Sequence, residues 1–249
     1  MTGDAAAVAS ARAEVAWHQA GLDILGVPWT IDDSMWWRTV VTTPVFLAAI
    51  TLDRSVSAVQ LAGAVAGLGG DVAVLDSFDA LDMAPHGYRR VYTEPWMMRR
   101  AGPFGSIGAA PAGFSVTRAI EPGDVALFER TVFMGMTGEY AEHSRGSVHP
   151  PTTGQFDTFR LLVGRAGGEA VAAGLSVPCP DGVLVSGIAT PAPHRRRGYG
   201  AAITRAVCET QPADDAFLRA SDMGRPTYER LGFATVGWAT VWARGEAAS

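Results

Sequence analysis

Hydrophobic and polar positions recur in two periods along the chain. In the first hundred residues, apolar side chains at helical spacing predict helices over residues 5–21 and 56–68, the second of them ending at a pair of glycines. A chain that mixes such helices with strands has an α/β or α+β fold. Runs of β-branched and aromatic residues predict strands over 36–43, 45–52, 71–75 and 87–99, with a short helix at 77–83.

Glycine and proline gather in residues 101–112, and we interpret this segment as a linker between a unit at 1–100 and a second unit at 113–249. The second unit contains a polar, loop-rich stretch over 136–155. Around that stretch, the pattern predicts a helix over 122–134 and strands over 114–118, 159–163, 170–177, 183–190 and 216–221.

The two units share an order of elements at a nearly constant offset. Each contains a helix, a strand, a short helix, a glycine followed by an aromatic residue, and a strand. We therefore expect the first unit to be a shortened, diverged copy of the C-terminal part of the second. The matching pairs are Ser77 and Ser221, 144 positions apart, and, at 145 positions, Gly87/Gly232, Tyr88/Phe233, Val91/Val236 and Arg99/Arg244.

The most informative stretch runs from Ile188 to Val207. A β-branched strand ends at Thr190, a loop of arginine and glycine follows, and a helical pattern begins. A strand, a loop and a helix N-terminus in this order direct backbone N–H groups and the positive end of the helix dipole at one point. Glycines in the loop let a ligand approach the backbone closely. The pattern therefore predicts a phosphate site.

Two common phosphate motifs do not fit this loop. A P-loop requires a lysine, and all 20 basic residues of this chain are arginine. A dinucleotide fingerprint requires three glycines and an acidic residue further on, and the loop offers two glycines, Gly198 and Gly200. Hydrolysis of ATP or GTP and binding of a dinucleotide are therefore disfavoured.

The remaining pattern, Arg195-x-x-Gly198-x-Gly200, resembles the pyrophosphate loop of the GNAT superfamily of acyl-CoA-dependent N-acyltransferases. The resemblance continues downstream, because 228–233 are similar to the family's Tyr-Glu-x-x-Gly-Phe signature, and it covers roughly residues 112–245. It implies a mixed, mostly antiparallel twisted sheet flanked by helices, here preceded by a shortened GNAT-like half. It also implies acetyl-CoA as co-substrate, with no metal.

By position in these motifs, the resemblance implies several site residues. Backbone groups of Ile188, Ala189 and Thr190 would hold the pantetheine and the thioester carbonyl of CoA. Tyr228 would protonate the departing thiolate, since a phenol stays protonated at neutral pH, or would serve in packing. Ser221 stands where many family members have asparagine and would contact CoA. The pyrophosphate loop would comprise Arg195, Arg196, Arg197, Gly198, Tyr199, Gly200 and Ala201.

The sequence does not single out a general base. Glu139, Glu142 and His143 lie in the segment that lines the acceptor site in related folds, and each could relay a proton through water or simply be solvated. The leading hypothesis is transfer of an acetyl group to a small amine or amino-acid-like acceptor by direct attack on the thioester. Two alternatives stay open: a binding module that senses acyl-CoA or a metabolite, and an acyltransferase for longer acyl groups or protein N-termini.

The first unit lacks a phosphate loop. Its counterpart, residues 52–55, has no glycine and carries Asp53, which would repel phosphate. We therefore expect one CoA per chain. Half a sheet cannot cover its own edges, so we also expect the first unit to dock on the second.

Composition narrows the class further. With 249 residues, 48% hydrophobic and 18% charged, the chain is expected to be globular, and its net charge of −5 argues against nucleic-acid binding. The N-terminus does not resemble a signal peptide, and the apolar run 45–52 is far shorter than a membrane span, so a cytoplasmic protein is expected. Two cysteines indicate neither a disulfide framework nor a metal site. A homodimer stays open, and arginine without lysine is typical of GC-rich bacterial coding.

Overall fold

The computed structural model of the chain describes residues 3–105, 109–140 and 145–245. The first half begins with a long helix and ends with a long strand. Its elements are α1 (Gly3–Ile24), β1 (Trp29–Ile31), β2 (Met35–Arg38), β3 (Ala49–Thr51), α2 (Ala58–Ala64), β4 (Val72–Asp76), the 3₁₀-helix η1 (Ala84–His86) and β5 (Arg89–Arg99).

The second half begins with a strand and a helix and also ends with a long strand. Its elements are β6 (Phe114–Arg118), α3 (Pro122–Met136), η3 (Thr153–Gln155), β7 (Arg160–Ala166), β8 (Glu169–Cys179), β9 (Gly182–Ala189), η4 (Ala192–His194), α4 (Tyr199–Cys208), β10 (Ala216–Arg219), α5 (Arg225–Arg230) and β11 (Ala234–Arg244).

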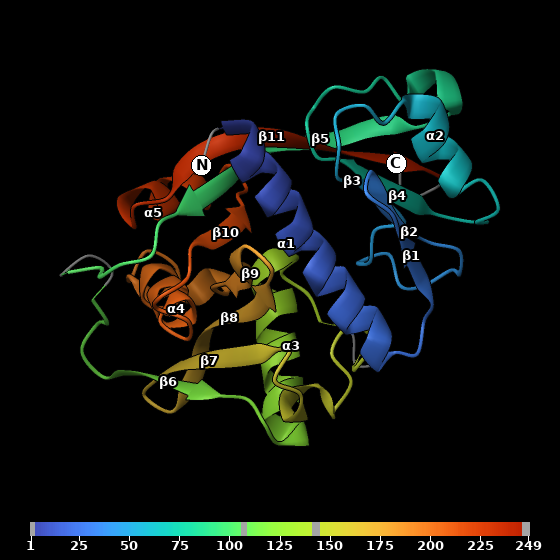
Figure 1. The fold of residues 1–249 in the computed structure, drawn as a ribbon. Coiled ribbons are helices and arrows are strands. Elements are labelled where there is room, and N and C mark those ends of the chain that lie inside the picture. The colour runs from blue at the N-terminus through green and yellow to red at the C-terminus, as the bar shows by residue number, and fades with distance from the viewer. Residues whose placement is uncertain (1–2, 106–108, 141–144, 246–249) are drawn as a thin grey trace.

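The strands of the described residues join in one sheet with the order β1-β2-β3-β4-β11-β5-β10-β9-β8-β7-β6 (Figure 1). Only the β3–β4 and β9–β10 pairings are parallel, and the other pairings of the sheet are antiparallel. The expectation of a mixed, mostly antiparallel sheet flanked by helices is confirmed.

The two halves exchange their last strands. β5 leaves the first half and pairs with β10 and β11, while β11 lies between β4 and β5. In Figure 1 the green β5 and the red β11 run together between the two sides of the molecule. The sheet of each half is therefore completed by a strand of the other. The unit boundaries at 1–100 and 113–249 stay a prediction, and part of the linker lies outside the described residues.

Helix α1 crosses the junction between the halves (Figure 1). Because both of its sides are buried, its sequence shows little amphipathic contrast. A Cβ on Gly237 of β11 would lie 3.1 Å from the Cβ of Ala7, so glycine at this position permits a close approach of strand and helix. From α1, the buried residues that pack in the core of the second half are Ala6, Ala9, Ala13 and Ala20, and those that pack in the core of the first half are Ala7, Ala11, Val15 and Leu22.

The helices cover opposite faces of the second half of the sheet. Side chains of β9 alternate between the faces: Leu184 packs in the core beneath α1 and α3, whereas Val183 and Val185 pack in the core beneath α4. The helix that follows the predicted phosphate loop therefore lies on one face, and the two helices α1 and α3 lie on the other.

The predicted short helix over 77–83 is wrong. These residues form a turn, and the 3₁₀-helix η1 follows it. The turn is organised by the carboxylate of Asp76, which competes with helical hydrogen bonding for nearby backbone donors. It accepts hydrogen bonds from the N–H groups of Phe78, Ala80 and Leu81.

The predicted strands over 36–43 and 45–52 are shorter than expected. β2 ends at Arg38, whose buried guanidinium donates to backbone carbonyls of the following loop. These carbonyls are bound by a side chain rather than by a neighbouring strand. Only Ala49–Thr51 of the second predicted strand therefore pairs within the sheet.

Candidate active site

The parallel strands β9 and β10 separate at their C-terminal ends. They pair through Val183–Ala216 and Leu184–Phe217, although β9 continues to Ala189. Beyond Leu184, the backbone of β9 on the side of β10 therefore does not pair with β10. The predicted thioester residue Ile188 lies on this part of β9, together with Ala189.

A bulge in β9 accompanies the separation. Opposite β8, Ser186 pairs with Leu175 and Ala189 pairs with Ala173, so β9 advances three residues where β8 advances two. Gly187 lies within this bulge at φ +60°, a conformation that favours glycine. Because a bulge bends its strand, it directs the end of β9 away from β10 and opens a gap in the sheet.

The side chain of Arg195 fixes the loop that follows β9. Its Nε donates to the carbonyl of Thr190 at 3.0 Å, and its Nη2 donates to the carbonyl of Gly135 in α3 at 2.8 Å. A Cβ on Gly135 would lie 2.9 Å from the nitrogen of Thr190, so the glycine lets α3 approach the end of β9. Arg195 therefore positions the loop, whereas Arg196 and Arg197 are exposed.

The N-terminus of α4 is open. Its N-cap is Gly198 at φ +84°, and no described side chain caps the helix. The first backbone N–H groups of α4 are therefore available to an anion, and a bound phosphate at this position stays a prediction. The helix α2 of the first half differs, because Ser57 and Gln60 form a capping box that occupies its N-terminus.

Besides Arg195, two further predicted CoA residues have side-chain contacts within the protein. The ring of Tyr199 stacks on Phe114, with the ring centroids 5.3 Å apart. The hydroxyl of Ser221 accepts a hydrogen bond from the N–H of Gly224 at 3.3 Å, in the turn before α5. Contact of either residue with CoA stays a prediction, and for Tyr199 the backbone is the group that the loop presents.

Tyr228 lies on α5 with its ring edge-on to Phe233. A Cβ on Gly224 would lie 2.8 Å from the ring of Tyr228, so this glycine leaves room for the tyrosine. Burial raises the pKa of Tyr228, and the negative charge of Glu94 raises it further. The phenol therefore stays protonated at neutral pH, as a general acid must.

A cavity of about 440 Å³ lies between the two halves. Its walls come from α1, the loop 44–47 and β4 and β5 of the first half, and from α3 and β11 of the second. It also reaches Ser186 and Gly187 at the bulge of β9, and Arg219 at the end of β10. Because this cavity meets the gap between the two strands, it is the candidate site for an acceptor.

Three charged side chains meet where β10 ends. The Nη2 of Arg219 lies 3.5 Å from Oε1 of Glu14 in α1, and its Nε lies 3.5 Å from Oε2 of Glu94 in β5. Burial raises the pKa of Glu94, although the charge of Arg219 opposes this effect. A carboxylate with a raised pKa, close enough to influence Tyr228, is suited to accept a proton.

Glu129 joins α3 to the loop segment 146–149, in which Val148 and His149 line the cavity. It is buried, and its carboxylate is engaged by four donors, so it holds the loop in place. The neighbouring His149 packs edge-on against Phe128 and Phe159, and burial lowers the pKa of this histidine to about 4. The donors to Glu129 are the N–H groups of Gly146, Val148 and His149 and the hydroxyl of Tyr140.

The predicted base residues are not brought to this cavity as a group. Glu139 is exposed after the end of α3 and does not line the cavity, and Glu142 and His143 lie outside the described residues. The sequence interpretation instead missed Glu94 and Arg219. A charged residue at the end of the apolar strand 216–219 was a signal for Arg219, but only the strand exchange brings Glu94 beside it.

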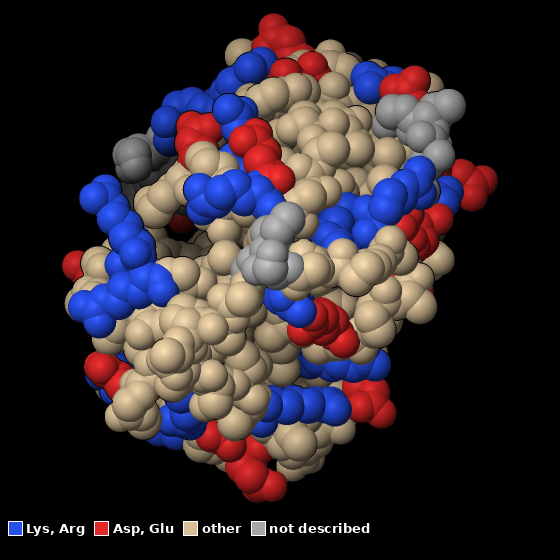
Figure 2. Space-filling view, turned by 90° about the vertical axis from the view of Figure 1, so that its left-hand side faces the viewer, with Lys and Arg blue, Asp and Glu red and all other residues tan. Residues whose placement is uncertain are grey.

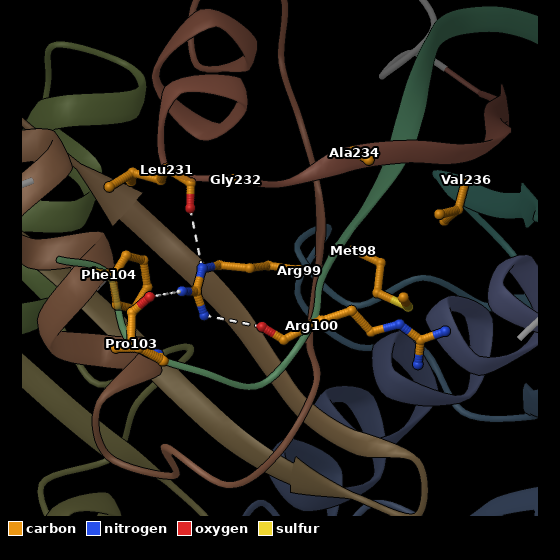
Figure 3. Close-up of a pocket in the computed structure, with 9 residues that line it drawn as sticks. All are labelled: Met98, Arg99, Arg100, Pro103, Phe104, Leu231, Gly232, Ala234 and Val236. Atoms are coloured by element: carbon orange, nitrogen blue, oxygen red, sulfur yellow. Dashed lines mark hydrogen bonds between the residues drawn. The ribbon is translucent and has the colours of Figure 1, made fainter. Parts of the chain in front are cut away.

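A second hollow, of about 470 Å³, lies beside the end of β5 (Figure 3). Arg99 donates there to the carbonyls of Leu231, Arg100 and Pro103, and its guanidinium lies 3.6 Å from the ring centroid of Phe104. Because its donors are engaged by the backbone, Arg99 fastens the chain after β5 to the end of α5. We therefore assign this hollow a structural role.

On the face shown in Figure 2, arginine groups (blue) are interspersed with carboxylate groups (red) instead of forming one basic surface. Among the described residues, no group of three or more histidine, cysteine and carboxylate side chains is arranged to hold a metal ion. Over the same residues, none of the helices combines the length and the apolar character needed to cross a membrane.

The structure is similar over nearly its whole length to GNAT proteins of known structure. A GCN5-related N-acetyltransferase from Kribbella flavida has a TM-score of 0.66 and 17% identity, covering 94% of this chain and 95% of that one. A protein of the GNAT family from Novosphingobium aromaticivorans has a TM-score of 0.58 and 17% identity, covering 91% and 95%. A tandem GNAT protein from the clavulanic acid biosynthesis pathway, in a structure without acetyl-CoA, has a TM-score of 0.53 and 12% identity, covering 93% and 94%.

No family model matches the sequence, and no curated protein matches it. The similarity to the solved structures concerns the fold, and it extends through both halves of the chain. The match to a tandem protein agrees with the internal repeat in the sequence. The chain therefore has the fold of the GNAT superfamily, built from two GNAT-like units that exchange their last strands.

Proposed function

We propose that the protein is an acetyl-CoA-dependent N-acetyltransferase that acts on a small amine or an amino-acid-like acceptor. The observation that carries the proposal is the gap between β9 and β10. On the α4 side of the sheet the gap adjoins an open helix N-terminus, and on the side of α1 and α3 it adjoins the cavity. A thioester in the gap would meet an amine held in the cavity.

The residues around the gap fit the two parts of acetyl-CoA that a protein must hold. The uncapped N–H groups of α4, with glycine at 198 and 200, suit a pyrophosphate. The backbone of β9 beyond Leu184, which lacks β10 as a partner, suits the amides of the pantetheine and the thioester carbonyl. When bound, acetyl-CoA supplies the activated acetyl group, and the remaining tasks belong to the chain.

Acyl transfer to an amine requires two proton movements. As the amine nitrogen bonds to the thioester carbon, the nitrogen must lose a proton, and we assign Glu94, which lies beside the cavity-lining Arg219, to accept it through a water molecule. As the carbon–sulfur bond breaks, the thiolate must gain a proton, which Tyr228 can donate and then regain from solvent. Arg219 positions Glu94 for this exchange.

The test is thiol release from acetyl-CoA with a panel of primary amines, combined with calorimetric measurement of acetyl-CoA binding. Release that depends on an amine supports the proposal. Binding of acetyl-CoA without release on any amine would favour a sensing module instead. Absence of acetyl-CoA binding would contradict both functions.

A further inference from the structure

Arg38 is a buried cation in the wall of the cavity. Its side chain is only 3% exposed, at the end of β2. Its Nε donates to the carbonyl of Leu47 at 3.1 Å, its Nη2 donates to the carbonyl of Phe46 at 3.0 Å, and its Nη1 donates to the carbonyl of Val40. Phe46 and Leu47 also line the cavity. The guanidinium is therefore held in one place by the loop around it.

No described carboxylate forms an ion pair with Arg38, and burial lowers its pKa. A guanidinium has five N–H donors, and three donate to carbonyls, so two remain for another acceptor. Arg219, which also lines the cavity, differs because it lies between Glu14 and Glu94. A buried charge without a counter-charge is costly, and an anion in the cavity would compensate it.

The rest of the cavity wall is mainly apolar. A volume of about 440 Å³ is large enough for one aromatic or aliphatic body with polar groups at its ends. A second polar region lies at Arg219 and Glu14, near Ser186 and Gly187 beside the gap. Among the larger apolar side chains of the wall are Trp17, Phe46, Leu47, Phe133, Met136 and Leu175.

We infer that the acceptor is an amine that carries a carboxylate on an apolar body, with the carboxylate bound by Arg38 and the amine directed toward the gap between β9 and β10. This inference rests on the proposed function, because it assigns the substrate class of the same site. An apolar amino acid, an ω-amino acid or a short apolar peptide has this chemistry. A plain alkylamine has no carboxylate, so its binding would leave the charge of Arg38 uncompensated.

A non-reactive probe tests the anion site without turnover. Calorimetry compares 3-phenylpropanoate with 3-phenylpropanamide, which present the same apolar body with and without a charge. A charge-assisted hydrogen bond to a buried guanidinium should make the carboxylate bind about tenfold tighter or more. Equal or weaker binding of the carboxylate would overturn the inference, whatever the catalytic activity of the protein.

Matched acceptors test the same inference during turnover. The pairs are 6-aminohexanoate with hexylamine and L-phenylalanine with L-phenylalaninamide. In at least one pair, the kcat/KM for thiol release should be about tenfold higher for the acceptor that carries the carboxylate than for its partner. A higher or equal kcat/KM for both partners that lack the carboxylate would contradict the inference and leave the proposed function standing. No release from any amine, together with tight binding of 3-phenylpropanoate, would contradict the proposed function alone.

Variants of Arg38 tie the preference to one side chain. Arg38→Gln should abolish the preference for 3-phenylpropanoate, and Arg38→Lys should retain part of it. Arg130→Gln is the matched control, since it removes the same charge from an exposed position of α3. Circular dichroism checks the fold, because Arg38 also holds a loop. A folded Arg38→Gln protein with the wild-type preference would overturn the inference. If the variant does not fold, the binding of 3-phenylpropanoate and 3-phenylpropanamide to the wild-type protein decides.

Discussion

Glu94 of β5 lies directly opposite Ala239 of β11, and the two residues are 145 positions apart, the offset of the internal repeat. Neighbouring pairs obey the same relationship. When 145 is added to the number of the β5 residue and subtracted from the number of its β11 partner, the two new numbers are another pair of the ladder. The ladder is therefore two-fold symmetric about Glu94 and Ala239. Examples are Tyr92–Val241 with Trp96–Gly237, Arg90–Trp242 with Met97–Thr235, and Arg89–Ala243 with Met98–Ala234.

The irregularities of the ladder obey the symmetry as well. The register shifts at Val91 in β5 and at Val236 in β11, which are again 145 positions apart. The chemistry is not symmetric, because Glu94 carries a carboxylate and Ala239 does not. The duplication therefore extends to backbone detail, whereas the carboxylate that we propose as the base is present on one side only.

The strand exchange predicts that the second half cannot fold alone. In a fragment of residues 110–249, β10 would lose β5, and β11 would lose both β4 and β5. The unpaired strand edges should make this fragment aggregate, which size-exclusion chromatography would measure. Co-expression with residues 1–105 should restore a soluble complex. A soluble, monomeric and fully active 110–249 fragment would contradict this prediction.

Gly200→Ala should weaken acetyl-CoA binding without loss of stability. A Cβ at this position would lie 3.5 Å from Oγ1 of Thr190, an ordinary contact, but it would stand between a pyrophosphate and the backbone. We expect the Kd from calorimetry to rise about tenfold or more, which corresponds to about 1.4 kcal/mol. Gly63→Ala in α2 is the control, because it adds the same methyl group to the helix of the first half. An unchanged Kd in Gly200→Ala would contradict the assignment of this loop as the pyrophosphate site.

Tyr228→Phe should lower kcat and leave the KM for acetyl-CoA nearly unchanged. The hydroxyl acts mainly in the transition state, and the ring can still pack on Phe233. Loss of a general acid typically costs on the order of 10²-fold in rate. Tyr88→Phe removes another buried hydroxyl, one without a hydrogen-bond partner among the described residues, and should keep the wild-type kcat. If kcat is unchanged in Tyr228→Phe, the tyrosine has only a packing role.

Glu94→Gln should lower kcat/KM for the amine on the order of 10²-fold, because the amide cannot accept the proton. Since burial raises the pKa of Glu94, the carboxylate is protonated at a higher pH than an ordinary glutamic acid. In the wild type, kcat/KM should therefore fall as the pH falls through this raised pKa. The variant should lack this limb of the pH profile, whereas Glu121→Gln, at an exposed position, should retain it. If the acidic limb of the pH profile is also present in Glu94→Gln, another residue is the general base.

His149 should make the folded state sensitive to mild acid. Burial lowers its pKa to about 4, whereas the unfolded chain binds the proton near the usual value of 6.5. The unfolded state therefore binds more protons between these values, and stability decreases as the pH falls from about 6.5 to about 4. The linked loss is about 3 kcal/mol at full effect. Urea titrations of the wild type and of His149→Gln should differ in slope over this range, and equal slopes would contradict the prediction.

The order β9, loop, α4 and β10 could be predicted because each step depends on local sequence. Thr190 ends a β-branched run, Gly198 marks the helix N-terminus, and apolar residues at helical spacing face the core. The cluster of Glu94 and Arg219 could not be predicted in this way. These side chains lie 125 positions apart in the sequence and meet only because β5 pairs with a strand of the other half.

The first half shows a different limit. The sequence predicts a short helix over 77–83, but the carboxylate of Asp76 accepts hydrogen bonds from three backbone N–H groups and stabilises a turn instead. Similarly, the burial of Arg38 could not be expected for an arginine in a strand pattern. In both cases a single polar side chain determines the backbone against the pattern of apolar residues.

The position of β11 has a consequence for synthesis on the ribosome. Its neighbour β4 ends at Asp76, whereas β11 begins at Ala234 and follows every other strand of the described residues in the chain. At typical translation rates the delay, over about 160 residues, is about 10–30 s. Until β11 has been made, β4 and β5 present strand edges that β11 fills in the folded structure. We therefore expect the nascent chain to be prone to pairing with neighbouring chains during this interval, and the eleven-residue strand β11 then completes both halves.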